Sequence, residues 1–146
     1  MTGTERLAIL ARGENPNLIL KMKSGFAVMA DSQFLPGYCL LLAYPEVATL
    51  NALEGESRIQ FLSDMAALGD AVKAATGAVR INYSIYGNLD PFLHAHISPR
   101  FDWEDETTRT LPPLSIPSEI KDDAAYQFEM SKHGELLRKI RELLTS

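Results

Sequence analysis

The most informative stretch of the chain covers residues 88–100, Asn88-Leu89-Asp90-Pro91-Phe92-Leu93-His94-Ala95-His96-Ile97-Ser98-Pro99-Arg100. Asp90-Pro91 is typical of a turn, and the residues after it predict a strand over 92–100. Successive side chains of a strand point to opposite faces of its sheet. One face of this strand is therefore apolar and suits a core, whereas the other carries Phe92, His94, His96, Ser98 and Arg100. The pattern places two imidazoles side by side, with a hydroxyl and a guanidinium beyond them.

The rest of the chain predicts an antiparallel sheet with two helices. The expected strands cover residues 17–23, 26–30, 38–42, 80–86 and 92–100, and Pro36-Gly37 marks the turn of a hairpin. A helix is expected over about 57–75, where one apolar stripe recurs every three or four residues and Gly77 is placed to cap the end. A second amphipathic helix is expected from about residue 131, after an ordered loop that begins at residue 101. This order of elements indicates the α+β class.

The size and composition of the chain fit one soluble domain. It has 146 residues, 46% of them hydrophobic and 23% charged, so we expect a single domain over 1–146, with a core over about 17–101 and a C-terminal loop and helix over 102–146. The net charge of −5 argues against nucleic acid and anionic membranes as partners. The longest apolar run, 38–44, is far too short to span a membrane. The single cysteine, Cys39, fits a reducing cytoplasm.

The two histidines allow three interpretations. Neighbouring imidazoles titrate near neutral pH, so one could attack a substrate while the other donates a proton or holds an anion. They could also be ordinary surface or packed residues. As metal ligands they would need a third partner, for which Asp102 or Glu104 is available in sequence, whereas His133 lies in the C-terminal helix. The chain lacks the glycine-rich lysine loop of P-loop enzymes.

Residues 93–100 resemble the signature of the histidine triad superfamily, in which three histidines alternate with apolar residues, often just before Pro-Arg. Residues 80–88 look like the preceding strand and Gly-Asn turn of bacterial members, and residues 33–41 look like their earlier hairpin. The resemblance spans about 26–100 and implies a sheet of about five antiparallel strands with a central and a C-terminal helix. It also implies a homodimer.

Aligning this sequence on Pro99-Arg100 assigns the three histidine positions to Phe92, His94 and His96. The resemblance implies that His96 attacks the α-phosphorus of a nucleotide and that His94 contacts the phosphates or the leaving group. Phe92 cannot support this network, because its side chain has no donor or acceptor. The further site residues that we expect are Asn88 and Ser98 as donors to the phosphates or leaving group, Asp31 at the ribose hydroxyls, and Gln33 in the lining of the same pocket.

The resemblance implies a nucleotide hydrolase or nucleotidyl transferase that works through a nucleotidyl-histidine intermediate. Attack by an imidazole divides one hard displacement at phosphorus into two easier ones. The implied substrates are adenine nucleotides and dinucleoside polyphosphates such as diadenosine tetraphosphate. The protein itself would need no cofactor, and Mg²⁺ would arrive only with the nucleotide. The alternative is a nucleotide-binding protein with weak or no turnover, because one of the three histidine positions holds Phe92.

Overall fold

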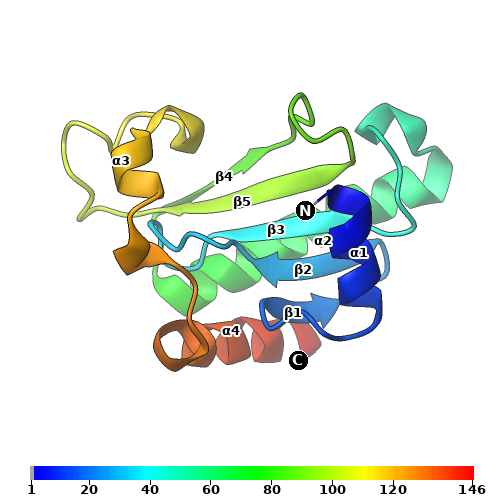
Figure 1. Cartoon of the computed structure of the whole chain (residues 1–146), viewed down its shortest axis with the longest axis horizontal. Helices are drawn as coiled ribbons and strands as arrows, with labels where there is room; N and C mark the ends of the chain where they lie inside the picture. The colour runs from blue at the N-terminus through cyan, green and yellow to red at the C-terminus, as the bar shows by residue number, and fades with distance from the viewer. Residues whose placement is uncertain (1) are drawn as a thin grey trace.

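Five antiparallel strands form one sheet in the order β1-β2-β3-β5-β4 in the computed structural model, which describes residues 2–146 (Figure 1). The strands are β1 (Leu18–Lys21), β2 (Gly25–Met29), β3 (Cys39–Ala43), β4 (Arg80–Ser84) and β5 (His94–Arg100). All five lie where the sequence predicts them. Three strands are shorter than predicted: β1 begins one residue late and ends two residues early, β4 ends two residues early, and β5 begins at His94 rather than Phe92.

Two helices cover one face of the sheet. They are α2 (Gly55–Thr76), which ends at Gly77 with φ of 74°, and α4 (Met130–Thr145). A left-handed C-terminal residue favours glycine, and the predicted cap is confirmed. Ala95 and Ile97 of β5 are fully buried beneath these helices, together with Leu137 and Ile140 of α4. The buried core therefore extends beyond residues 17–101 into the C-terminal helix.

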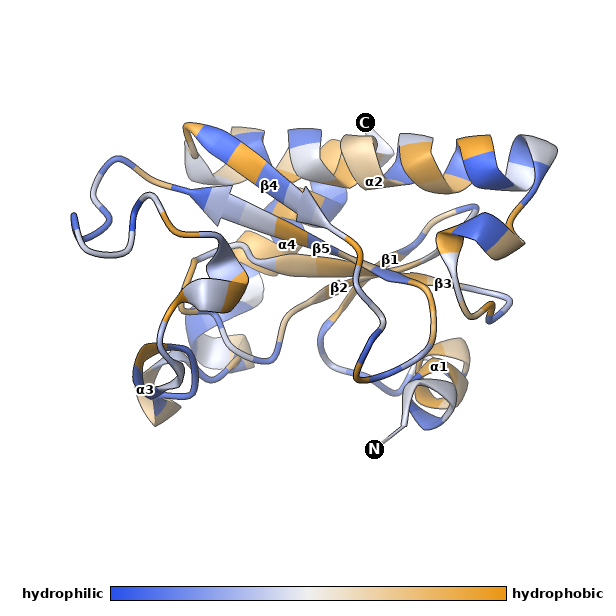
Figure 2. Cartoon of the chain, turned by 90° about the horizontal axis from the view of Figure 1, so that it is seen from above, coloured by the Kyte–Doolittle hydropathy of each residue, from blue (hydrophilic) through white to orange (hydrophobic). Residues whose placement is uncertain are grey.

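The opposite face is covered at both ends and open between them. At one end lies α1 (Gly3–Ala11), an element that the sequence analysis does not predict. At the other lies the segment 101–128, which includes two 3-10 turns, Pro113–Ser115 and Ala124–Tyr126, and the short helix α3 (Ser118–Lys121). Figure 2 shows α1 and α3 on the same side of the sheet, apart from each other and opposite α2. The middle of β5 lies between them.

Both covering elements are fixed by specific contacts. Helix α1 begins with a capping box. The Thr2 side chain accepts a hydrogen bond from the Glu5 backbone N–H, and the Glu5 carboxylate accepts one from the Thr2 backbone N–H. Its apolar residues Leu7 and Leu10 pack on a cluster that includes Phe92. The segment 101–128 is tied to the loop after β2, because the Gln33 N–H donates to the Tyr126 carbonyl at 2.7 Å.

Within residues 2–146, no helix is both long and apolar enough to cross a lipid bilayer.

A third 3-10 turn, Leu50–Ala52, lies in the connection between β3 and α2.

Candidate functional site

Three rings form a row along β5 on the open face of the sheet. The Phe92 and His94 ring centroids are 4.5 Å apart, and those of His94 and His96 are 5.1 Å apart. Both histidines are partly buried and oppose Leu42 and Leu40 of β3. The alternation of faces predicted for residues 92–97 is therefore confirmed.

The backbone fixes the orientation of His94. Its Nδ1 lies 2.8 Å from the carbonyl oxygen of Phe92. A carbonyl oxygen only accepts hydrogen bonds, so Nδ1 carries the proton and donates it. The neutral His94 ring therefore has its free lone pair on Nε2, which is the arrangement that a nucleophile or general base requires.

His96 has a different environment. Its Nδ1 lies 2.5 Å from the Tyr38 hydroxyl, and the Tyr86 ring lies 6.0 Å away. Burial, followed by the neighbouring His94, lowers the pKa of His96 to about 4. Burial also raises the pKa of the Tyr38 phenol above its usual range. At neutral pH the contact therefore joins a neutral imidazole to a protonated phenol.

A cavity of about 230 Å³ adjoins His96 on the side of the segment 101–128. Its walls combine aromatic, aliphatic and hydroxyl side chains with one charged pair: Ser32, Phe34, Tyr38, Ser84, Tyr86, His96, Ser98, Pro113, Leu114, Lys121 and Asp122. The Lys121 carbonyl accepts a hydrogen bond from the Ser32 hydroxyl, and Lys121 Nζ donates to the Leu114 carbonyl at 2.9 Å. The cavity is thus built into the fold and not a gap under a loose loop.

Ser98, which the sequence analysis expects to donate to the substrate, lies in the lining of this cavity. Its side chain is 1% exposed, and its hydroxyl oxygen has no hydrogen-bond partner within the described chain. Buried hydroxyl groups are almost always paired. Ser98 is therefore a polar group available to a bound molecule.

The other three predicted binding residues lie in different surroundings. Asn88 is exposed in the loop after β4 and is absent from the cavity lining. Asp31 is 59% exposed, accepts a hydrogen bond from Asn17 at 3.1 Å and pairs with Arg6 at 3.5 Å. Gln33 is buried, and its amide nitrogen donates to the carbonyls of Ala30 and Tyr38. Its Oε1 accepts from the Gly37 N–H, so the amide braces a loop and does not line the cavity.

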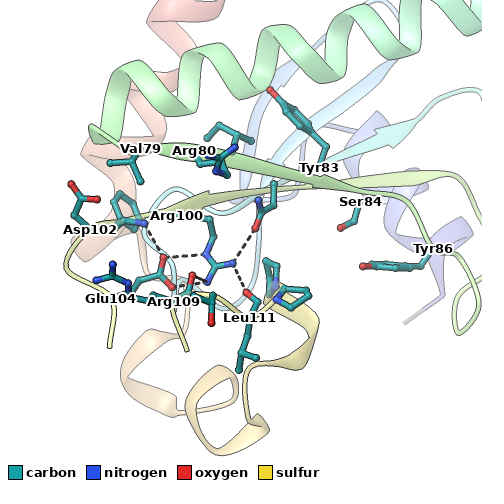
Figure 3. Close-up of a pocket in the computed structure, with 16 residues that line it drawn as sticks. Val79, Arg80, Tyr83, Ser84, Tyr86, Arg100, Asp102, Glu104, Arg109 and Leu111 are labelled. Atoms are coloured by element: carbon teal, nitrogen blue, oxygen red, sulfur yellow. Dashed lines mark hydrogen bonds and ion pairs between the residues drawn. The ribbon is translucent and has the colours of Figure 1, made fainter. Parts of the chain in front are cut away.

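Arg100, on the same strand face, holds the segment 101–128 and does not reach the histidines. Its guanidinium forms two hydrogen bonds to the Glu104 carboxylate, at 2.9 and 3.0 Å, and one to Asn82 at 3.0 Å. It also donates to the carbonyls of Thr108, Arg109 and Leu111. Figure 3 shows this network inside a groove of about 820 Å³ along β4.

These contacts bear on the metal interpretation. The Glu104 carboxylate also accepts the Phe101 N–H, so its oxygens are occupied away from the two histidines. Across residues 2–146, no three His, Cys, Asp or Glu side chains gather as a metal site requires. Trp103 stacks on Phe101, with ring centroids 4.8 Å apart.

The sequence analysis missed Tyr38 and Tyr86, the two aromatic residues nearest His96. Tyr38 lies two residues before Leu40, and Leu40 pairs with His96 across β3 and β5. A diagonal neighbour on the same face of an antiparallel pair is within reach of a long side chain. The pairing of these strands was therefore the missing information.

Comparison with solved structures identifies the fold. No protein-family model matches the chain, and no curated protein matches it in sequence. Its structure is similar to that of a histidine triad protein from Marinobacter aquaeolei VT8, with TM-score 0.72, 17% identity and coverage of 97% of this chain and 93% of that one. A histidine triad protein from Bradyrhizobium japonicum gives TM-score 0.71 and 18% identity, with coverage of 87% and 89%.

A hypothetical histidine triad nucleotide-binding protein from Sulfolobus tokodaii gives TM-score 0.71 and 14% identity, with coverage of 95% and 90%. The chain therefore has the histidine triad fold, as its residues 93–100 predict.

Proposed function

We propose that the chain is a nucleotide hydrolase or nucleotidyl transferase that attacks the α-phosphate of an adenine nucleotide or a dinucleoside polyphosphate. The observation that carries the proposal is the pair of adjacent imidazoles on the open face, one of which has its Nε2 lone pair fixed by a backbone contact. The histidine triad fold supports a nucleotide as the ligand, and the similar protein from Sulfolobus tokodaii is described as nucleotide-binding.

The hydrogen bonds favour an exchange of the two roles that the sequence resemblance implies. His94 has an unprotonated Nε2 in its neutral form, so we assign it as the nucleophile. His96 lies next to the cavity and we assign it to the phosphate oxygens or leaving group. Phosphate oxygens gain charge in the transition state, and fixed donors aimed at them lower the barrier.

The reaction then has two steps. In the first, His94 Nε2 bonds to the α-phosphorus while the bond from phosphorus to the leaving group breaks, and a polyphosphate leaves as an anion with the bonding electrons. In the second, water bonds to phosphorus, the phosphorus–nitrogen bond breaks, and the water proton passes to solvent. A transferase would replace water by another hydroxyl or amine. Mg²⁺ would enter only with a polyphosphate substrate.

The cavity beside His96 is the natural place for the leaving group. It adjoins the proposed phosphate site, and Ser98 contributes a hydroxyl without a partner. The Asp31 carboxylate is 59% exposed and still has acceptor capacity beside its contacts with Asn17 and Arg6, so it stays a proposed acceptor for the ribose hydroxyls. Asn88 stays a proposed donor that would act from the exposed loop after β4.

The test is turnover by the wild type, His94→Asn and His96→Asn on adenosine and guanosine nucleotides and dinucleoside polyphosphates, with intact-protein mass spectrometry after rapid quenching. We expect a nucleotidyl adduct in the wild type and in His96→Asn, and none in His94→Asn. An adduct that survives His94→Asn but not His96→Asn would restore the roles implied by the sequence. Absence of both turnover and adduct in the wild type would reject the enzyme proposal.

A nucleotide-binding protein with little turnover is the second candidate. Phe92 stacks on His94 at 4.5 Å but provides no hydrogen-bonding group at the first position of the triad. Calorimetric binding of a nucleotide without turnover, unchanged in His94→Asn, would favour this candidate.

We also propose that the protein works in the cytoplasm as a homodimer. The edge strand β4 offers unpaired backbone groups, and Val79 and Tyr83 are exposed along it.

A further inference from the structure

Tyr38 reaches the histidine pair from the loop that leads into the adjacent strand, β3. Its hydroxyl lies 2.5 Å from His96 Nδ1, and the two rings are nearly parallel, with an interplanar angle of 26°. Within the described chain, this is the only hydrogen bond that involves either the Tyr38 hydroxyl or the His96 ring. Phe34 meets the Tyr38 ring edge-on at 5.7 Å and limits its rotation.

The loop that carries Tyr38 is unusually well braced. The Tyr38 carbonyl accepts hydrogen bonds from the Ala30 N–H and the Gln33 amide, both at 2.9 Å, and the Tyr38 N–H donates to Leu35. The Gln33 amide is buried and makes three hydrogen bonds, all to backbone groups between residues 30 and 38. Gln33, which the sequence places in the substrate pocket, thus fixes the position of Tyr38.

The direction of the Tyr38–His96 hydrogen bond follows from a count of protons. The phenol keeps its proton at neutral pH, and His96 is neutral there, because burial acts on both groups. The phenol has one possible acceptor in the described chain, His96 Nδ1. If Tyr38 donates to Nδ1, the single proton of the neutral imidazole must be on Nε2.

We propose that Tyr38 is a positioning residue that holds His96 with its proton on Nε2, so that His96 donates a hydrogen bond to the phosphate or leaving group while His94 keeps a free Nε2 lone pair. The assignment of a substrate contact to His96 rests on the function proposed above. The proton position itself does not, because it follows from contacts within this chain.

The protein contains its own reference for each proton position. It has three histidines. His94 donates from Nδ1 to a carbonyl, which is the Nδ1-protonated form. His133 Nδ1 accepts the Glu129 N–H at 3.0 Å, so its neutral ring is protonated on Nε2. Protonated and unprotonated ring nitrogens have well-separated ¹⁵N shifts, so His96 can be compared directly with both.

The experiment is ¹⁵N NMR of histidine-labelled full-length protein at a pH where all three rings are neutral, with signals assigned from His96→Asn and His133→Asn. We expect His96 to show the pattern of His133. A pattern like that of His94 would overturn the proposal, because Nδ1 would then donate to Tyr38. In Tyr38→Phe, we expect the His96 signals to move toward a mixture of both forms, whereas unchanged signals would also overturn it.

Kinetics test the consequence for turnover. We expect Tyr38→Phe to lower kcat by roughly tenfold, the effect of one lost hydrogen bond, with a smaller change in KM. Tyr44→Phe is the matched control, because Tyr44 lies just beyond the end of β3 and its ring packs on Phe26, and no hydrogen bond or ring pair joins it to a histidine within residues 2–146. Its kcat should stay at the wild-type value. A wild type without turnover would reject the proposed function, yet the NMR result would still decide the role of Tyr38.

Discussion

At the residue scale, identical side chains two positions apart on one strand acquire different chemistry from their partners. His94 meets a carbonyl of its own chain, whereas His96 meets a phenol and a cavity wall. The sequence predicts that both lie on one face, because alternation is a property of the strand itself. It cannot predict their proton positions, because these depend on atoms that the fold brings from the turn before β5 and from the loop before β3.

The burial of His96 predicts a specific pH dependence of stability. Its pKa is about 4 in the folded protein, whereas an unfolded histidine has a pKa of about 6.5. Between these values the unfolded chain binds a proton that the folded chain does not. The folded state therefore loses stability as pH falls from about 6.5 to about 4, and this group adds no further loss below that range.

Urea unfolding of the wild type and His96→Asn at several pH values between 7 and 4 measures this contribution. The carboxylates titrate in both proteins, so the difference in unfolding free energy isolates His96. We expect the wild type to lose its stability more steeply than the variant. Parallel curves would show that His96 titrates normally in the folded state.

At the element scale, the Arg100 side chain fixes the beginning of the segment 101–128 through hydrogen bonds, although it lies on the same strand as the two histidines. Its side chain and that of Glu104 are 8% and 5% exposed, and the pair holds the turn that begins the segment 101–128. The sequence predicts an ordered loop there, but neither this ion pair nor α3, because one carboxylate, one side-chain amide and three backbone carbonyls converge on Arg100 only in the folded chain.

Arg100→Met should destabilise the protein by about 3–5 kcal/mol, because the buried Glu104 carboxylate loses its only positively charged partner within residues 2–146. Urea unfolding measures the loss, and limited proteolysis should show new cleavage within residues 101–112. The double variant Arg100→Met/Glu104→Leu should recover much of the stability. Arg12→Ala is the control: the exposed Arg12–Glu14 pair should contribute less than about 1 kcal/mol. Equal losses in the single and double variants would contradict the role given to the ion pair.

Helix α1 depends on a close contact with the Phe92 ring. A Cβ added at Gly3 would overlap the Phe92 ring. The Thr2-Glu5 spacing could have indicated the start of a helix. Its docking could not be predicted, because Gly3 and Phe92 are 89 positions apart in sequence.

Gly3→Ala should therefore lower the unfolding free energy by roughly 1–3 kcal/mol, since a well-packed site must shift to admit the methyl group. Phe92→Leu will also be destabilising on its own, because it removes buried ring contacts. The double variant should lose less than the sum of the two single losses, since the smaller side chain makes room for the methyl group. Thermal and urea unfolding of all four proteins gives this coupling, and strict additivity would argue against the contact.

At the scale of the whole molecule, the hydrophobic pattern predicts the class, all five strands and the two helices of the core. The two helices and β5 have a periodicity that indicates one buried face, and β2 and β3 are short continuous apolar runs typical of strands buried on both faces. The elements on the other face lack such a hydrophobic pattern. Helix α1 is short, and the segment 101–128 is held by hydrogen bonds to Arg100 and to the loop at 31–33. The cavity beside His96 therefore could not be predicted, because four of its eleven lining residues, Pro113, Leu114, Lys121 and Asp122, come from that segment.

The edge of the sheet leads to a prediction about assembly. β4 pairs only with β5, so its other side has free backbone donors and acceptors. Val79 and Tyr83 are 52% and 41% exposed at this edge, and Ile59 of α2 is 66% exposed. A second copy that adds its own β4 in the antiparallel direction would pair these groups and cover apolar surface.

We therefore expect sedimentation velocity to give twice the chain mass of 16.2 kDa at micromolar concentration. Tyr83→Lys should shift the protein to monomer, because a charge would enter the centre of the interface and repel its symmetry mate. Leu143→Lys on α4 is the matched control, since it replaces a similarly exposed apolar side chain on another surface, and it should stay dimeric. A wild type that sediments as a monomer, or a Tyr83→Lys variant that stays dimeric, would show that the β4 edge is not the contact between copies.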